Sequence, residues 1–354
     1  MGNTLTVQER NAMFAQATRQ NYQGLGKKSV NTGASTLSFI LPKARLMSKI
    51  LLDIDMKFKL KHDDSSTFET DESTPYRPIR RISLDLNNGF APFVIGGREL
   101  QVYNGIRQYG HIIKPQSEDI TGYCYCPTEF ATSPEGVEHF MHTTVELANT
   151  LNDRDPVGLI LTQNNETNIE LKIDFESESE MLGAMDGYRL EVVEFSVKPT
   201  IESFSIPAIA NAMPDLSVIK LVNSRTEAFT GAGQNLINLA TGTIYRKLAF
   251  IVEDETGSPF VDEDFTSNID LVFNQADVNY SIPAEMLRHI NEAQFGCPMP
   301  KGVYVFDFSY NGVSNYGGTR DYIDTEMLTM FQVRFNSKKA GRVRIVSECL
   351  ARLV

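Results

Sequence analysis

The chain has 354 residues, a net charge of −12, 42% hydrophobic and 22% charged residues, and a mass of 39.6 kDa. This composition is typical of a globular protein and excludes a disordered or collagen-like chain, and the length favours two domains. No apolar run approaches the roughly 18 residues of a membrane span, and we expect no secretory signal at the N-terminus.

The charge is distributed unevenly along the chain. Residues 1–50 carry seven cations and one anion, a net charge of +6, whereas the remaining 304 residues carry 26 cations and 44 anions, a net charge of −18. The seven cations are Arg10, Arg19, Lys27, Lys28, Lys43, Arg45 and Lys49. Because an acidic body repels polyanions and a basic arm attracts them, we expect the N-terminal segment to contact any polyanion that the protein meets.

The first predicted element is a helix. Thr6-Val7-Gln8-Glu9 has the pattern of a capping box, in which the hydroxyl and the carboxylate bind free amides of the first turn. The apolar residues that follow, and the stop at Gly24 and Gly26, predict a helix of about four turns before a flexible stretch with Lys27 and Lys28. Such a helix is marginal alone in water, so we expect it to form against another surface.

Strands are predicted for most of the remaining chain. Residues 50–60 alternate between apolar and charged side chains, which predicts a strand with one buried face. Further strands are expected at 79–86, 92–104, 136–147, 168–175, 187–198, 244–253, 268–273, 302–309, 327–335 and 341–352. Many short strands separated by turn residues predict a sandwich or barrel and not alternating β-α units.

Two segments differ from this pattern. Residues 61–78 are polar and predict an exposed loop. The segment from Pro283 to Gly296 predicts an internal helix, with the proline in its first turn, Met286, Leu287 and Ile290 as its apolar residues, and the glycine as its stop.

The two halves of the chain contain similar pairs of strands. Residues 169–175 are similar to residues 329–335, and residues 187–194 are similar to residues 341–348, which lie 160 and 154 residues further along. Such a repeat predicts two copies of one β-domain. We expect their boundary in the proline-containing segment near residues 200–215.

His139, His142 and Glu146 are the strongest candidates for a metal site. They are similar to the histidine pair and glutamate of a double cupin, which makes a double-cupin metalloenzyme one alternative. However, residues three apart on a strand point to opposite faces, so the two histidines cannot bind one ion. We therefore expect no metal site here.

The remaining chemical groups also argue against catalysis. Cys124, Cys126, Cys297 and Cys349 form no CxxC pair and no zinc spacing, so we expect small apolar roles for them. His62, His111 and His289 are isolated, and no local motif of a hydrolase or metalloprotease is found. We expect no catalytic residue, no metal and no cofactor. A carbohydrate-binding jelly roll stays as the second alternative, with Tyr and Phe as its stacking groups.

The most specific motif follows the internal helix. Pro300-Lys301-Gly302-Val303-Tyr304 resembles the Pro-Lys-Gly-Val-Tyr segment of tectivirus major capsid proteins, which are coat proteins of tailless phages with an internal membrane. Weaker similarities occur in the same order along nearly the whole chain. They are the glutamine-rich N-terminal helix, Ala44-Arg45-Leu46, residues 168–175, and Tyr245-Arg246-Lys247-Leu248.

The resemblance implies an all-β fold of two tandem eight-stranded jelly rolls, with an N-terminal helix and short inserted helices. On this basis we expect an N-terminal helix and basic arm at 1–30, a first jelly roll at 31–205 and a second at 206–354. It further implies a structural protein and not an enzyme. Three copies would form a homotrimer of pseudo-hexagonal outline, and these capsomers would tile an icosahedral shell around an internal membrane.

The resemblance also implies partners and a location. Arg10, Phe14, Arg19, Lys27 and Lys28 would form a membrane-proximal arm, so that deleting residues 1–24 should weaken liposome binding and leave the trimer intact. The expected partners are further copies of the chain, the viral internal membrane, and minor capsid, vertex and membrane proteins, without sequence-specific nucleic-acid binding. The protein would reside in the virion shell, and in the host cytoplasm during assembly.

Overall fold

A computed structural model of the chain describes residues 6–43, 45–86, 89–107, 124–151, 156–162, 168–183, 185, 187–231, 233–274, 277–309 and 322–352. The described residues form two compact units, which divide between Lys220 and Leu221, except that residues 105–107 group with the second unit and Arg352 with the first. The helices in this part of the chain are α1 (Val7–Ala17), α2 (Gly97–Arg107) and α3 (Ala284–Phe295), with 3₁₀ turns η1 (Thr74–Tyr76), η2 (Ala210–Ala212) and η3 (Asp262–Asp264).

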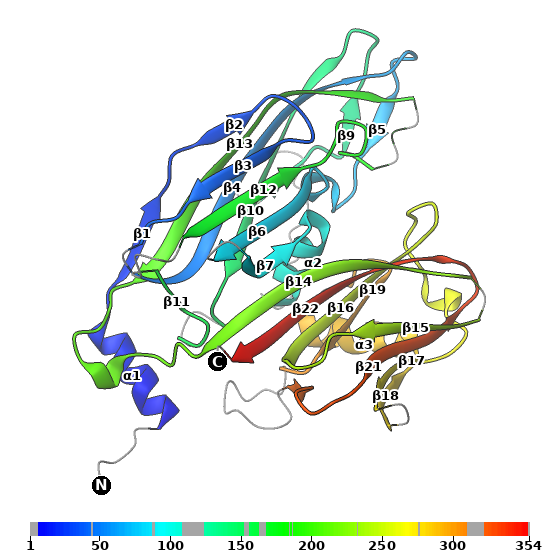
Figure 1. The fold of residues 1–354 in the computed structure, drawn as a ribbon. Helices are drawn as coiled ribbons and strands as arrows, with labels where there is room; N and C mark the ends of the chain where they lie inside the picture. Colours follow the sequence, from blue (N-terminus) through cyan, green and yellow to red (C-terminus); the bar gives the residue numbers. More distant parts are fainter. Residues whose placement is uncertain are drawn as a thin grey trace. The chain divides into compact units, whose positions relative to one another are not determined.

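The first unit contains two main sheets (Figure 1). In one, β1 (Gln20–Gly24) and β2 (Lys28–Val30) both pair with the outer edge of β13 (Arg189–Phe204). The strands β4 (Leu46–Lys61) and β10 (Val137–Ala148) follow on its other side. In the other, the order is β3 (Thr36–Ile40), β12 (Ile169–Phe175), β6 (Ile79–Leu86) and β7 (Phe90–Ile95). Short strands add to these: β8 (Cys124–Tyr125) pairs with β10, β11 (Ile160–Leu161) with β4, and β5 (Thr67–Glu69) with β9 (Glu129–Ala131).

The second unit repeats this arrangement. One of its sheets has the order β14 (Val218–Phe229), β22 (Gly341–Arg352), β16 (Ile244–Asp254) and β19 (Val303–Asp307), and β20 (Ile323–Asp324) pairs with β16. The other has the order β15 (Gly233–Leu239), β21 (Phe331–Ser337), β17 (Ile269–Phe273) and β18 (Asp277–Ile282).

The strand order shows that both units are jelly rolls. If β1 and β2 are taken as one interrupted strand, each unit has eight main strands, which pair in the orders 1-8-3-6 and 2-7-4-5. A helix follows the fifth strand in both: α2 follows β7, and α3 follows β18. The prediction of an all-β chain with two tandem jelly rolls and inserted helices is therefore confirmed, and the repeat is more extensive than the two strand pairs seen in the sequence.

Alternation along β4 explains how the first unit forms its core. The apolar side chains of this strand are fully buried, namely Ile50, Leu52, Ile54, Met56, Phe58 and Leu60, whereas the charged residues between them face outward. Burying each such side chain contributes about 1.5–3 kcal/mol. The two sheets of the unit pack face to face, because the rings of Phe175 on β12 and Phe195 on β13 lie 5.2 Å apart.

Aromatic side chains dominate the core of the second unit. Tyr245 on β16 contacts Phe331 on β21 across the two sheets, with ring centroids 5.1 Å apart in an edge-to-face arrangement. Phe335 lies 5.3 Å from Phe229 and 5.5 Å from Phe265 in the same geometry. Such pairs stabilise a core beyond their buried area by about 0.5–1.5 kcal/mol each.

The N-terminal helix is shorter than predicted. It ends at Ala17, because Thr18 has an extended backbone and its hydroxyl donates to the Phe14 carbonyl. Residues 20–24 then form β1, and residues 28–30 form β2 where a flexible stretch was expected; both pair with β13. Residues 20–24 form backbone hydrogen bonds with the edge of β13, where the last turns of the helix were expected. Both strands fall inside the 1–30 segment that the sequence assigns to an arm.

Two other predictions are wrong in part. The strand expected at 92–104 ends at Ile95, and the chain continues as α2. This helix is buried on most sides and mixes polar with apolar residues, so that no apolar period distinguished helix from strand. The expected loop at 61–78 contains β5 and the buried turn η1. The internal helix is confirmed: Pro283 is its N-cap, and Gly296 ends it with a left-handed φ of 69°.

Candidate functional site

The two histidines of the predicted strand lie on opposite faces of β10, as expected. The Nε2 atom of His139 is 2.8 Å from the Ala131 carbonyl oxygen. His142 is held on the other face by two carboxylates, with 2.8 Å from Nδ1 to Asp55 and 3.2 Å from Nε2 to Asp53. The histidines therefore do not meet at one point, and among the described residues no cluster of three or more His, Cys, Asp or Glu side chains is arranged to hold a metal ion.

Where the structure describes them, the cysteines and the other histidines show no arrangement of a nucleophile with a base. Burial is the main cause that raises the pKa of the Cys124, Cys126 and Cys349 thiols to about 12, so these thiols are neutral at pH 7 and unreactive. Their predicted role as small apolar residues fits this burial. The ring of His62 lies 4.6 Å from that of Tyr188, and His111 lies outside the described residues, as does Ala44.

Stacking platforms for a sugar are few on the described surface. The large aromatic side chains exposed there are Tyr22, with 56% exposure, and Phe90, with 42%. They lie on β1 and β7, which belong to different sheets. Two aromatic side chains on separate sheets do not form a single platform of the kind that carbohydrate sites use.

The capping box at the start of α1 is confirmed. The Glu9 amide donates to the Thr6 hydroxyl at 3.2 Å, and the Thr6 amide donates to the Glu9 carboxylate at 2.8 Å. The second of these hydrogen bonds is the main cause that lowers the pKa of Glu9. The box fixes where the helix begins.

Phe14 attaches α1 to the first unit. Its side chain is only 5% exposed and packs with Leu46 and Leu159, and its ring lies 5.6 Å from the ring of Phe204 in an edge-to-face arrangement. Further partly buried side chains complete this cluster, namely Leu161, Ile206, Met213 and Leu216. Phe14 therefore faces the protein and is not available to a membrane while α1 is docked.

The four cations predicted for the arm fall into two pairs. Arg10 lies on α1 and Arg19 just after it, where the Arg19 amide donates to the Ser205 hydroxyl at 2.9 Å. Lys27 lies 3.6 Å from the Glu194 carboxylate, and the Lys28 ammonium lies 5.0 Å above the ring of Phe39 and donates to a backbone carbonyl of β3. The lysines thus belong to the jelly roll and the arginines to the helix.

The Pro300–Tyr304 segment forms the turn that begins β19. Gly302 has a φ of 75°, and a side chain at this position would meet the Val252 carbonyl oxygen at 2.6 Å. The Val252 amide donates to the Gly302 carbonyl at 2.8 Å. Val303 pairs with Ile251, and Tyr304 is buried. The turn therefore has a structural role, and only glycine fits at position 302.

Tyr304 connects this turn to a network of charged groups. Its hydroxyl donates to Asp262 at 2.8 Å, and Asp262 also binds Arg288 of α3 at 2.7 Å. Burial, followed by the hydrogen bond to Asp262, raises the pKa of Tyr304. The turn, η3 and α3 are therefore held together by one carboxylate.

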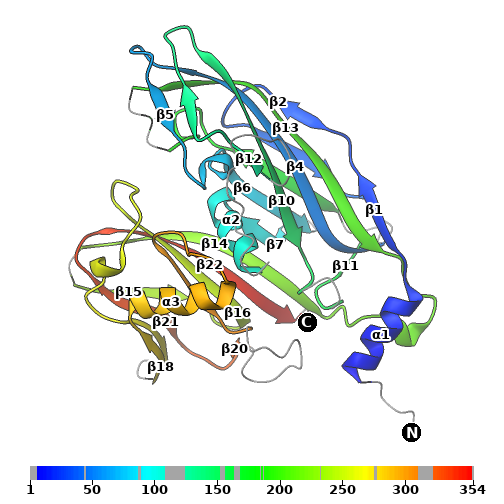
Figure 2. The ribbon, with the colours of Figure 1, turned by 180° about the vertical axis from the view of Figure 1, so that it is seen from behind.

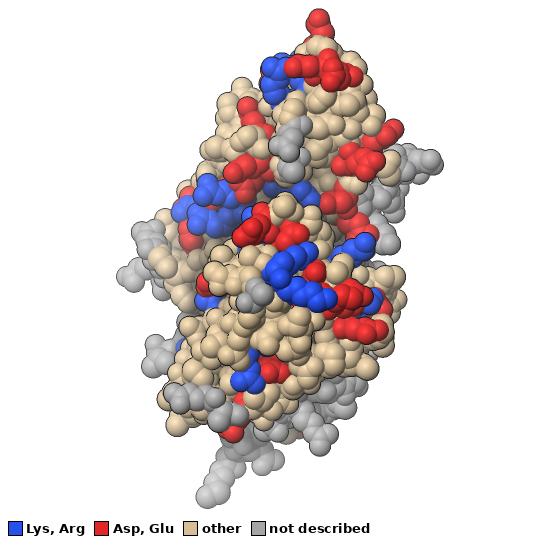
Figure 3. Space-filling view, turned by 90° about the vertical axis from the view of Figure 1, so that its right-hand side faces the viewer, with Lys and Arg blue, Asp and Glu red and all other residues tan. Residues whose placement is uncertain are grey.

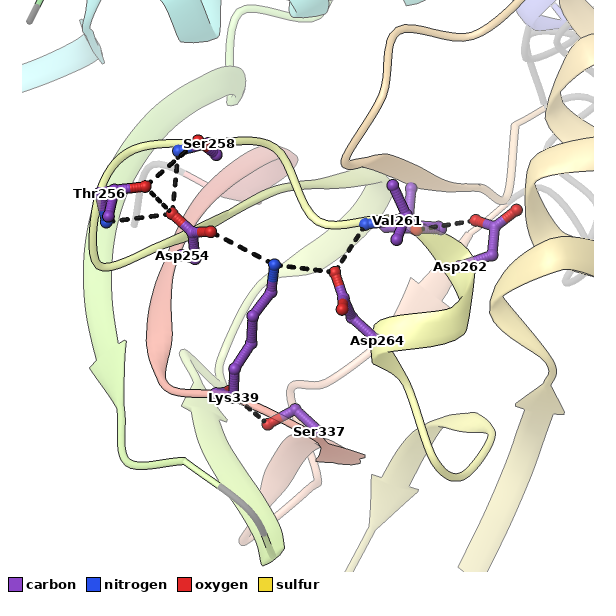
Figure 4. A network of polar contacts seen from close by, with 9 residues as sticks. Asp254, Thr256, Ser258, Val261, Asp262, Asp264, Ser337 and Lys339 are labelled. Carbon is purple, nitrogen blue, oxygen red and sulfur yellow. Dashed lines mark hydrogen bonds and ion pairs between the residues drawn. The ribbon is translucent and has the colours of Figure 1, made fainter.

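Lys339 joins two loops of the second unit beside this network (Figure 4). Its ammonium lies 3.2 Å from Asp254 and 3.1 Å from Asp264. Asp254 in turn accepts hydrogen bonds from Thr256 and Ser258, and the one from the Thr256 hydroxyl is the main cause that lowers its pKa to about 2. The carboxylates are thus occupied by Lys339 and by their own loop.

Charges of both signs share the surface shown in Figure 3, where lysine and arginine side chains lie next to aspartate and glutamate side chains. The ion pairs of the first unit include Lys61–Glu191 at 2.8 Å and Arg81–Asp174 at 2.9 Å. None of the described helices is long and apolar enough to cross a membrane.

Comparison with known proteins finds similarity only in three dimensions. No known family and no curated protein matches this sequence. The major capsid protein of Sulfolobus Turreted Icosahedral Virus is similar with a TM-score of 0.68 and 12% identity, over 94% of this chain and 97% of that one. A PBCV-1 virus capsid chain gives 0.64 and 10%, over 94% of both chains. The major capsid protein P2 of bacteriophage PM2 gives 0.57 and 11%, over 95% and 98%. These likenesses show a shared double jelly-roll fold.

Proposed function

We propose that this chain is the major capsid protein of a virus. The observation that carries the proposal is the match over nearly the full length of both chains to viral major capsid proteins, which includes both jelly rolls. The internal repeat supports it, because two units with the same strand order let one chain supply two similar building blocks. The function is then structural, and the protein resides in the virion shell, and in the host cytoplasm during assembly.

Three copies of the chain would form the capsomer. Three chains with two similar units each supply six similar units, which gives a trimer a pseudo-hexagonal outline suited to tiling an icosahedral shell. Electron microscopy of the purified protein tests this, and the expected result is particles with six lobes. Particles with one or two lobes at all concentrations would contradict the proposal.

The N-terminal helix would contact an internal viral membrane, as the resemblance to tectiviruses of tailless phages implies. Cations at and just after this helix support the contact, because each cation near an anionic bilayer contributes about 1 kcal/mol. Arg10 and Arg19 would supply this contact, since Phe14 faces inward and the two lysines bind within the first jelly roll. Minor capsid, vertex and membrane proteins would be further partners, without sequence-specific nucleic-acid binding.

Substitution tests this contact better than deletion of residues 1–24, because that deletion also removes β1 and uncovers the pocket of Phe14. Arg10→Gln/Arg19→Gln should reduce flotation with phosphatidylserine vesicles at low salt. Arg189→Gln/Lys198→Gln is the matched control, since both cations are exposed on β13 and lie outside the arm. Equal flotation of the arm variant and the unmodified protein would contradict the proposal, and preferential binding of duplex DNA would indicate a nucleic-acid contact instead.

A further inference from the structure

The helix α3 exposes two large apolar side chains on one face. Met286 and Ile290, one helical turn apart, are 51% and 44% exposed, and we call them the α3 face. The other side of the helix is fixed to the protein, where the buried Asn291 amide group donates to the Val305 carbonyl at 2.8 Å and accepts from the Val305 amide at 2.9 Å. In Figure 2, α3 (orange) is drawn in front of the strands of its unit.

The equivalent helix of the first unit has no such exposed face. Both helices contain the spacing Leu-x-x-x-Asn, as Leu100 with Asn104 in α2 and Leu287 with Asn291 in α3, and these four residues are buried. In this alignment Glu99 and Tyr103 occupy the positions of Met286 and Ile290. Their exposure is 5% and 1%, so the face that α3 leaves open is covered in α2.

One of the groups that cover α2 comes from β14. The ammonium of Lys220, at the start of this strand, donates to the Tyr103 hydroxyl at 3.1 Å and lies 5.7 Å from the centre of its ring. β14 is the first strand of the second jelly roll, and its counterpart in the first jelly roll is β1 with β2. Arg19, just before β1, is exposed, and Tyr22 on β1 is 56% exposed.

We propose that the α3 face is covered by β1 of a second copy of this chain. The contact would resemble the one that Lys220, at the start of β14, makes with Tyr103 of α2 inside the first compact unit, and the inference rests on the proposed self-assembly. A helix of one copy and a strand of the next form a head-to-tail contact, which closes into a ring when three copies are related by threefold symmetry.

Solution mass by light scattering tests the proposal with variants that change only exposed side chains. Met286→Glu/Ile290→Glu should have the mass of a single chain, whereas the unmodified protein should have that of three. Met327→Glu is the matched control, because Met327 is 90% exposed on the same unit, and this variant should keep the mass of three chains. Circular dichroism checks that the variants fold.

The outcomes separate this inference from the proposed function. A double variant that keeps the mass of three chains overturns the inference and leaves the proposed function standing. An unmodified protein that stays a single chain overturns both. If the double variant fails to fold, peroxide oxidation of the unmodified protein decides: in the associated protein Met286 should oxidise at least five-fold more slowly than Met327, which stays exposed. Equal rates overturn the inference.

Cross-linking tests the choice of β1. Chains with Tyr22→Cys and chains with Ile290→Cys, both with Cys297→Ser to remove the half-buried native thiol near α3, are coexpressed and treated with a short bismaleimide. Covalent dimers should form with this pair and not when Met327→Cys replaces Ile290→Cys. Equal yields for the two pairs, or no dimers in an associated protein, overturn the assignment of β1.

Discussion

Single residues explain why the Pro300–Tyr304 turn has its sequence. Gly302 adopts a φ of 75° and passes so close to Val252 that no side chain fits, and Tyr304 binds Asp262, which also holds Arg288. The motif that carries the resemblance to capsid proteins therefore serves the fold of the second jelly roll, with no reactive group in it.

Gly302→Ala should destabilise the protein by about 2–3 kcal/mol, because it adds a steric overlap with the Val252 carbonyl to the strain of a positive φ. Gly242→Ala is the matched control: its φ is 86°, and a side chain there meets no atom within 4 Å, so about 1 kcal/mol is expected. Urea unfolding measures both values. Equal losses for the two variants would show that the close approach at Gly302 is relieved by movement of the chain.

Asp254 makes the second unit sensitive to acid. Its pKa in the folded protein is lowered from 3.8 to about 2, so its contribution to stability is complete above about pH 4 and is lost as the pH falls toward 2. Thr256→Val removes the main cause of the shift, and Lys339→Met removes a smaller one. We expect the Asp254 pKa, followed by carboxyl NMR, to rise more in Thr256→Val than in Lys339→Met. The reverse order would show that the ion pair, and not the loop hydrogen bond, controls this group.

At the scale of elements, the N-terminal segment shows how tertiary contacts override local preference. The capping box and the apolar residues correctly place the start of α1, but the pairing of residues 20–24 with β13 ends the helix earlier than Gly24 suggests. α2 was missed for another reason. It is buried on most sides, polar residues included, so its apolar residues follow no helical period, and the Leu-x-x-x-Asn spacing that it shares with α3 is its one visible helical feature.

Phe14→Ala should detach α1, because this side chain is the buried anchor of the helix. A loss of about 3 kcal/mol is expected for removing a buried phenylalanine, and the amide protons of residues 10–17 should exchange faster while those of β4 stay protected. Gln16→Ala, an exposed position on the same helix, is the control and should change neither quantity. Unchanged exchange in Phe14→Ala would show that other contacts hold the helix.

At the scale of the whole molecule, the repeat was partly visible in the sequence. Residues 169–175 are the seventh strand of the first jelly roll, and residues 329–335 overlap the seventh strand of the second. Residues 187–194 and 341–348 cover the start of the two eighth strands. Strands with one buried face, such as β4, were predicted well because alternation encodes that face directly. The pairing order and the open face of α3 depend on contacts between distant segments, which no local pattern records.

Light scattering after gel filtration of the unmodified protein tests the central claim most directly. We expect a mass of three chains of 39.6 kDa each, stable on dilution as for a large obligate interface. A mass of one chain that persists at high concentration would contradict self-assembly, and with it the proposed capsid function.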